Sequence, residues 1–94
     1  MAETKRWYVY LLECQDGSIY TGIAIDVAAR FAAHRAGKGA RYTRSHPPLR
    51  ILASEAFEDQ AAALRAEIRI KKLRASAKRA YVTKLLGASS PATT

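Results

Sequence analysis

Two basic side chains, Arg30 and His34, are four residues apart in a stretch with a helical pattern, so they lie one turn apart on one face. A guanidinium group can bind two phosphate oxygens and an imidazole can carry a proton, so the pair is suited to hold and polarise a phosphate group. The alternative is two ordinary solvated side chains, which the spacing by itself favours.

A single carboxylate, Glu67, lies on a narrow polar arc of a second predicted helix, together with Lys71. A helix with two separate polar arcs packs on both sides or lines a site along one of them. Mg²⁺ takes one or two protein carboxylates and completes its shell with water and phosphate oxygens, so Glu67 could be such a ligand. The alternative is an i,i+4 ion pair with Lys71, worth about 0.3–0.5 kcal/mol, which the pattern alone favours.

Three tyrosines, Tyr8, Tyr10 and Tyr20, lie in predicted strands. Strand tyrosines usually pack with a solvated hydroxyl. A phenol close to cations and a metal could instead orient a water molecule or accept its proton, which requires its ordinary pKa of ~10 to be lowered. Composition leaves both interpretations open.

The elements that must position these residues alternate between strand and helix patterns, in the order β-β-α-β-α-α. We expect strands over 7–14, 18–25 and 49–57, a loop over 37–48, and helices over 26–35, 59–74 and 76–86, with Asp26 and Ser76 as caps and Gly87 as a stop. This order predicts an α+β fold built on a small three-stranded antiparallel sheet. Residues 1–86 are expected to form one domain, with 87–94 as a flexible tail.

The first turn decides whether the two central tyrosines share a face of the sheet. A two-residue turn at Asp16-Gly17 would pair Tyr10 with Ile23 and put Tyr10 and Tyr20 on opposite faces. A three-residue loop with Gly17 in the left-handed region would pair Tyr10 with Gly22 and put both phenols on one face. A joint site requires the second register, so we predict an odd-length loop or a bulge.

Composition restricts the classes of protein and of partner. The 94 residues carry 16 Lys and Arg against 8 Asp and Glu, a net charge of +8, which favours a polyanionic partner. No apolar run reaches the ~18–20 residues of a membrane span, and no signal peptide is visible, so a cytoplasmic protein is expected. The spacing of Cys14, His34 and His46 fits no structural zinc pattern.

A basic segment between residues 37 and 50 is the best candidate for contact with nucleic acid. It contains four cations and no acid, with an aromatic ring among them: Lys38, Arg41, Tyr42, Arg44 and Arg50. Cations bind phosphates and an aromatic ring can stack on a base. Lys71 on the later helix could join them, although solvated surface is the ordinary alternative.

Together these motifs resemble a known family. Tyr8-Val9-Tyr10, then Tyr20-Thr21-Gly22, Arg30, His34 and Glu67 follow the order and spacing of the GIY-YIG nuclease domain. The tracts over 37–44 and 70–73 resemble its small stand-alone bacterial branch. The resemblance covers residues 6–84.

The resemblance implies a fold and a reaction. It implies a three-stranded antiparallel sheet flanked by helices, and a metal-dependent endonuclease that hydrolyses DNA with one Mg²⁺ (or Mn²⁺) ion held by Glu67. Arg30 would stabilise charge on the scissile phosphate, His34 would assist proton transfer, and Tyr10 or Tyr20 would activate or position the water. Association with the nucleoid follows, with low sequence specificity, a preference for single-stranded or branched DNA, and a separate protein that supplies target recognition.

Two departures from the family pattern keep an alternative open. Tyr8 occupies the position where the first motif has glycine. The chain also contains no asparagine, whereas many members carry one after the glutamate helix. The alternative is a catalytically inactive nucleic-acid-binding module on the same fold.

Overall fold

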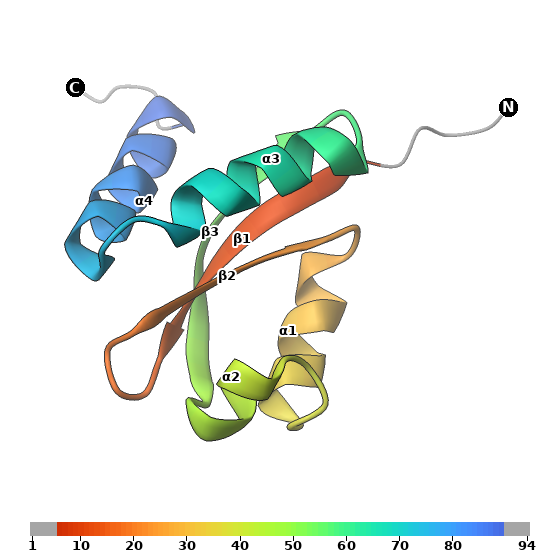
Figure 1. The fold of residues 1–94 in the computed structure, drawn as a ribbon, viewed down its shortest axis with the longest axis vertical. Helices are drawn as coiled ribbons and strands as arrows, with labels where there is room; N and C mark the ends of the chain where they lie inside the picture. Colours follow the sequence, from red (N-terminus) through yellow and green to blue (C-terminus); the bar gives the residue numbers. More distant parts are fainter. Residues whose placement is uncertain (1–5, 90–94) are drawn as a thin grey trace, which may run out of the picture.

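The computed structural model describes residues 6–89 and has the predicted α+β architecture. The elements in chain order are β1 (Trp7–Cys14), β2 (Ile19–Ala24), α1 (Val27–Arg35), α2 (Arg41–Ser45), β3 (Pro48–Phe57), α3 (Gln60–Lys71) and α4 (Ala75–Ser89). The strands form one antiparallel sheet in the order β2-β1-β3. Helices α3 and α4 lie on one face of the sheet, and α1 and α2 lie on the other (Figure 1).

The β1–β2 hairpin has the three-residue loop that a joint tyrosine site requires. Tyr10 pairs with Gly22, and Leu12 pairs with Tyr20. The Cys14 amide donates to the Ser18 carbonyl at 2.9 Å. Gly17 has φ of 86°, the left-handed conformation that glycine adopts without strain. The predicted register is therefore confirmed, and both phenols belong to one face.

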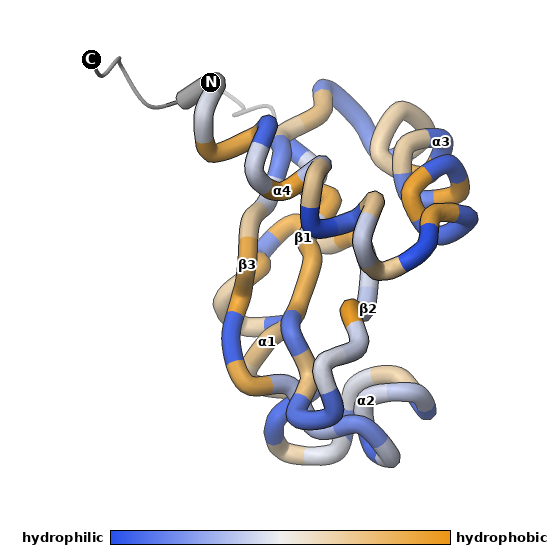
Figure 2. The backbone as a smooth tube through the Cα atoms, turned by 90° about the vertical axis from the view of Figure 1, so that its left-hand side faces the viewer, coloured by the Kyte–Doolittle hydropathy of each residue, from blue (hydrophilic) through white to orange (hydrophobic). Residues whose placement is uncertain are grey.

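The central strand β1 is hydrophobic along its middle and contributes to two cores (Figure 2). Alternate residues of a strand point to opposite faces, so Val9 and Leu11 pack toward α3 and α4, whereas Tyr10 and Leu12 pack toward α1. The first core is purely apolar at its centre and consists of Val9, Leu11, Ile19, Ala53, Ala63, Ala66, Ile70 and Val82. The second core is smaller and leaves room for polar groups.

The segment between α1 and β3 was predicted as a loop, and this was wrong for part of it, because Arg41–Ser45 forms the short helix α2. The residue before α2 is Ala40, whose side chain makes no capping hydrogen bond, so the usual sequence signal of a helix start is missing. The hydrogen bond between Thr43 of α2 and His34 of α1 holds this short helix in place.

The ends of the last helix also differ from the prediction. Helix α4 begins at Ala75, so Ser76 lies within its first turn, and the helix continues through Gly87 to Ser89. Ser76 is therefore not the cap and Gly87 is not the stop, because a glycine costs a helix only about 1 kcal/mol and does not by itself end it. Residues 90–94 of the predicted tail lie outside the described residues. Within residues 6–89, no helix combines the length and apolar character needed to cross a membrane.

Candidate active site

The centre of the second core is a hydrogen bond between Tyr10 of β1 and His34 of α1. The Tyr10 hydroxyl lies 2.8 Å from His34 Nε2, and both residues are only 1% exposed. Polar groups are buried at little cost only when they are paired. His34 is therefore not the solvated side chain that its spacing alone favoured.

The other nitrogen of His34 is also engaged. His34 Nδ1 lies 2.7 Å from Thr43 Oγ1, and the Thr43 hydroxyl donates to the Ala40 carbonyl at 3.0 Å. The Thr43 hydroxyl has one proton, which it donates to the Ala40 carbonyl. The short contact with His34 therefore places the proton of the ring on Nδ1, which donates to Thr43 Oγ1. Nε2 is then an acceptor, and the Tyr10 hydroxyl donates to it. The Ala40 amide points at the same nitrogen from 3.4 Å and would donate to it only in the other tautomer, so the shorter contact with Thr43 decides the assignment.

The surroundings favour neutral His34. Burial, followed by the positive charge of Arg30, lowers the pKa of His34 below its ordinary value of 6.5. An imidazole that is neutral and unprotonated at Nε2 is a base that can receive a proton from Tyr10.

Two glycines make room for this pair of side chains. A Cβ at Gly22 would lie 2.5 Å from the Tyr10 hydroxyl and 3.0 Å from Tyr20 Cε2. A Cβ at Gly39 would overlap the imidazole ring of His34. Both positions therefore exclude side chains because the rings of the site fill the space.

Arg30 and Glu67 approach Tyr10 from two different helices. Arg30 is exposed on α1, one turn before His34, and Glu67 is half-buried on α3. Burial first, and then the neighbouring Tyr20, raise the pKa of Tyr10 to about 12, while Arg30 lowers it and Glu67 raises it further. A phenol in these surroundings does not ionise on its own near neutral pH, so any role in proton transfer depends on His34.

Tyr20 extends the site toward the surface as part of a series of rings. Its ring centroid lies 5.1 Å from that of His34 and 6.0 Å from that of Tyr42, which stacks on His46 at 4.0 Å. Lys71 lies over Tyr20, with Nζ 5.8 Å from the ring centroid. Lys71 Nζ is also 3.4 Å from Glu67 Oε2, so the i,i+4 ion pair forms at the border of the site.

These motifs, now assembled in three dimensions, agree with a known family. The model of the GIY-YIG catalytic domain matches residues 6–80. The chain belongs to the GIY-YIG family. The family in general consists of endonucleases that act on nucleic acid and use a divalent metal.

Relatives of similar length match most of the chain. The chain is 54% identical over 85 residues to a UPF0213 protein of Cupriavidus pinatubonensis, and the match covers 90% of this chain and 94% of the relative. It is 47% identical over 75 residues to a UPF0213 protein of Streptococcus agalactiae, and the match covers 80% of this chain and 85% of that relative.

Two solution NMR structures have a similar fold. The UPF0213 protein of Bacillus halodurans has a TM-score of 0.53 at 45% identity, with 83% of each chain covered. A protein of E. faecalis has a TM-score of 0.62 at 33% identity, with 100% of this chain and 98% of that chain covered. Each match extends over most of both chains, so the similarity concerns the whole fold.

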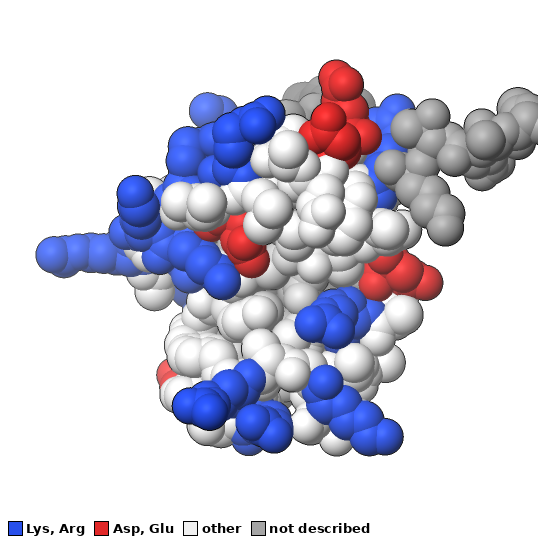
Figure 3. Space-filling model, turned by 45° about the vertical axis from the view of Figure 1, so that its right-hand side comes forward, with Lys and Arg blue, Asp and Glu red and all other residues white. Residues whose placement is uncertain are grey.

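The GIY-YIG structure brings most of the predicted site residues together and leaves others around them. Tyr10, Tyr20 and His34 are in mutual contact, and Arg30 of α1 and Glu67 of α3 lie close enough to Tyr10 to act on its pKa. The remaining candidates lie farther out and are exposed: Lys38, Arg41, Tyr42, Arg44 and Lys71. Basic side chains gather over α1 and α2 and again over the end of α3 near α4, and a strip of mostly uncharged surface separates them (Figure 3).

Sequence reasoning missed Thr43, which fixes the ring of His34, and Lys78, whose ammonium group donates to the Ile19 carbonyl at 3.1 Å. Thr43 is nine residues from His34 and no periodicity links them. Lys78 resembles any polar residue of an amphipathic helix. Only the docking of α2 and α4 onto the sheet reveals their partners.

Proposed function

We propose that this chain is a metal-dependent endonuclease that hydrolyses DNA phosphodiesters with low sequence specificity, and that it prefers single-stranded or branched DNA. It would act in the cytoplasm on nucleoid DNA, with a separate protein supplying target recognition. The observation that carries the proposal is the buried chain Tyr10–His34–Thr43, which ends next to Arg30 and Glu67.

One carboxylate, Glu67, would hold the proposed magnesium-type ion. Glu67 is a half-buried carboxylate, with Lys71 as its recorded ion-pair partner. Across residues 6–89, there is no group of three or more His, Cys, Asp and Glu side chains that could enclose a metal. One carboxylate suits Mg²⁺ or Mn²⁺, which keep water and phosphate oxygens as ligands, and does not suit zinc. The ion, when bound, would polarise the phosphate and offset the charge that develops on it.

The residues of the chain divide the remaining work. Arg30 would bind two oxygens of the scissile phosphate, where a fixed cation stabilises the transition state. As a water oxygen attacks phosphorus, the water proton would pass to the Tyr10 oxygen while the Tyr10 proton passes to His34 Nε2. The bond from phosphorus to the leaving oxygen then breaks, and this oxygen would take up a proton from a solvent water molecule. A concerted transfer avoids a free phenolate, which the raised pKa of Tyr10 disfavours.

The structure supports Tyr10 rather than Tyr20 as the proton acceptor, because the hydroxyl of Tyr10 has a base to receive its own proton. Tyr20 would close the site from the outside through its edge contact with His34. Lys38, Arg41, Arg44 and Lys71 would bind phosphates of the strand, and Tyr42 would stack on a base.

The test is cleavage of labelled single-stranded, duplex and flap DNA in the presence of Mg²⁺, Mn²⁺ or EDTA. Cleavage that requires the metal and is lost in Glu67→Ala and Arg30→Ala, but kept in the surface control Arg65→Ala, supports a nuclease. Binding without cleavage in either metal overturns it in favour of an inactive binding module. The loss in the two variants excludes a contaminating nuclease.

A further inference from the structure

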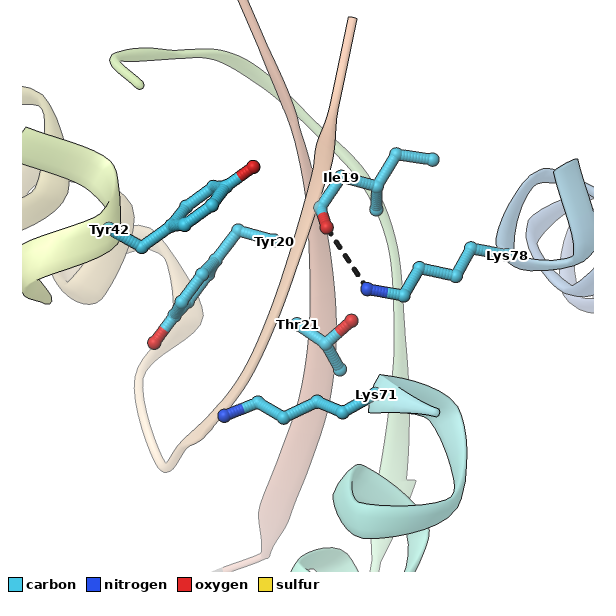
Figure 4. A pocket seen from close by; sticks show the side chains of 6 residues that line it. All are labelled: Ile19, Tyr20, Thr21, Tyr42, Lys71 and Lys78. Carbon is cyan, nitrogen blue, oxygen red and sulfur yellow. Dashed lines mark hydrogen bonds between the residues drawn. The ribbon is translucent and has the colours of Figure 1, made fainter. Parts of the chain in front are cut away.

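A cavity of about 320 Å³ lies beside the proposed active site, on the outer side of Tyr20 (Figure 4). Strand β2, helix α2 and the adjoining ends of α3 and α4 surround it. Its lining residues are Ile19, Tyr20, Thr21, Tyr42, Lys71 and Lys78. Tyr20 therefore forms a wall of this cavity and also contacts His34 of the site. We call it the Lys71–Lys78 pocket.

Lys78 holds a positive charge at the wall of this pocket. The side chain reaches from α4 to the edge strand, where Nζ donates to the Ile19 carbonyl. Burial first, and the charge of Lys71 second, lower the pKa of Lys78. In the part of the chain that the structure describes, no recorded ion pair involves Lys78. An anion in the pocket would relieve the repulsion between the two ammonium groups.

Thr21 supplies a second, independent sign of a ligand. Its side chain lies between the two lysines in Figure 4, and Oγ1 is buried without a hydrogen-bond partner among residues 6–89. A buried hydroxyl that lacks a partner costs about 1–3 kcal/mol, and such groups are rare in folded proteins. A phosphate oxygen would accept the hydrogen bond that the fold leaves unmade.

The opposite wall of the pocket is aromatic. Tyr42 is 38% exposed, stacks on His46 with the ring centroids 4.0 Å apart, and lies 6.0 Å from the Tyr20 ring at an interplanar angle of 23°. Stacked rings at a groove edge accept nucleobases, whatever the base. Two cations facing an aromatic wall match a nucleotide unit, which joins a phosphate to a base. A free phosphate ion would use only one side of this pocket.

We propose that the Lys71–Lys78 pocket binds the phosphate that flanks the cleaved phosphodiester in a single-stranded segment of the substrate, while the next base stacks on Tyr42. Lys78 and Thr21 are then substrate-binding residues. The inference rests on the proposed nuclease function and deepens it, because it fixes where the strand continues beyond the site.

Binding of a fluorescent single-stranded oligonucleotide in EDTA tests this without requiring cleavage. The variants are Lys78→Met, Lys78→Arg and the control Lys84→Met, an exposed lysine on the same helix. We expect Lys78→Met to reduce the slope of log K against log salt by about 0.7, the value for one phosphate contact with a single strand. Lys78→Arg should keep the slope, as should Lys84→Met. Equal slopes for Lys78→Met and Lys84→Met would overturn the proposal.

A neutral methylphosphonate placed at each position in turn of an oligonucleotide short enough to bind in one register identifies the phosphate. We expect one position at which the neutral group weakens binding of the wild-type protein and not of Lys78→Met, and equal losses for both proteins elsewhere. If the neutral group weakens the binding of both proteins equally at every position, the pocket assignment is overturned. If the wild type still cuts DNA in Mg²⁺, the nuclease proposal survives that result, and absence of both binding and cleavage refutes both proposals.

Discussion

The two faces of the sheet are built by the same strand and have opposite characters. Toward α3 and α4, Val9 and Leu11 enter a core of aliphatic side chains. Toward α1 and α2, Tyr10 enters a core in which His34 and Thr43 are buried with it and hydrogen-bonded. The difference indicates that the buried core under α3 and α4 contributes mainly stability, while the buried proton path lies on the other face; α3 adds Glu67 to the site from beside the edge strand β2. Substitutions at the neighbouring residues Tyr10 and Leu11 of β1 can separate the effects on cleavage rate from the effects on stability.

Tyr10→Phe removes one hydroxyl from the polar face, and we expect the largest loss of activity. The ring still packs, but the proton path to His34 Nε2 is gone, so the rate of single-turnover cleavage should fall by about 10²–10⁴-fold. The free energy of unfolding should fall by about 1–3 kcal/mol, because His34 Nε2 is left buried without a partner; urea denaturation measures this change. A variant that cuts DNA at the wild-type rate would contradict a role for Tyr10 in proton transfer.

Leu11→Ala changes the adjacent residue on the apolar face and should have the opposite effect. The side chain is fully buried, so the truncation leaves a cavity that should cost about 2–5 kcal/mol of unfolding free energy. The fraction that remains folded should cleave at close to the wild-type rate. A loss of rate larger than the loss of folded protein would show that the two faces are not separable.

Gly39→Ala forces the imidazole of His34 to move, because the added methyl group occupies the position of the ring. A displacement of about 1 Å in a catalytic group can cost 10²-fold in rate. Gly87→Ala is the matched control, since a Cβ there meets nothing within 4 Å. The cleavage rates of the two variants, measured side by side, should differ by about that factor. Equal rates would show that the position of His34 is unimportant.

Thr43→Val keeps the shape of the side chain but removes the acceptor for His34 Nδ1. We expect the cleavage rate to fall by about two- to tenfold, which corresponds to the 0.5–1.5 kcal/mol of one hydrogen bond. The tautomer can be read from the ¹⁵N chemical shifts of His34, which should report a protonated Nδ1 in the wild type and a mixture in Thr43→Val. A protonated Nε2 in the wild type would reverse the direction of the proton path.

The spacing of residues predicted the parts of the fold and site that depend on local geometry. Gly17 allowed the three-residue loop, and the loop placed Tyr10 and Tyr20 on one face. The helix spacing likewise placed Arg30 one turn before His34. Local sequence patterns do not show which side chains of different helices and strands come into contact. The burial of His34 depends on α2, whose start at Ala40 has no capping side chain.

The site residues that sequence reasoning missed show the same limit. Thr43 looked like one more polar residue of a basic loop, and its hydroxyl matters because tertiary packing places it 2.7 Å from an imidazole. Lys78 comes 59 residues after Ile19, its hydrogen-bond partner. Tyr8, the departure in the first motif, is paired along the strands with Ala24 and Ala56, and its side chain is half-buried.

The central claim is that neutral His34 receives a proton through Tyr10, and the pH dependence of single-turnover cleavage tests it most directly. Because the pKa of His34 is lowered below 6.5, the base is ready at neutral pH and becomes protonated only in acid. The wild-type rate should be level between about pH 7 and 9 and fall by about tenfold per pH unit once the pH drops below the lowered pKa. In His34→Ala the rate should be low throughout, without this acid limb. The same acid limb in His34→Ala, at the wild-type rate, would contradict the account.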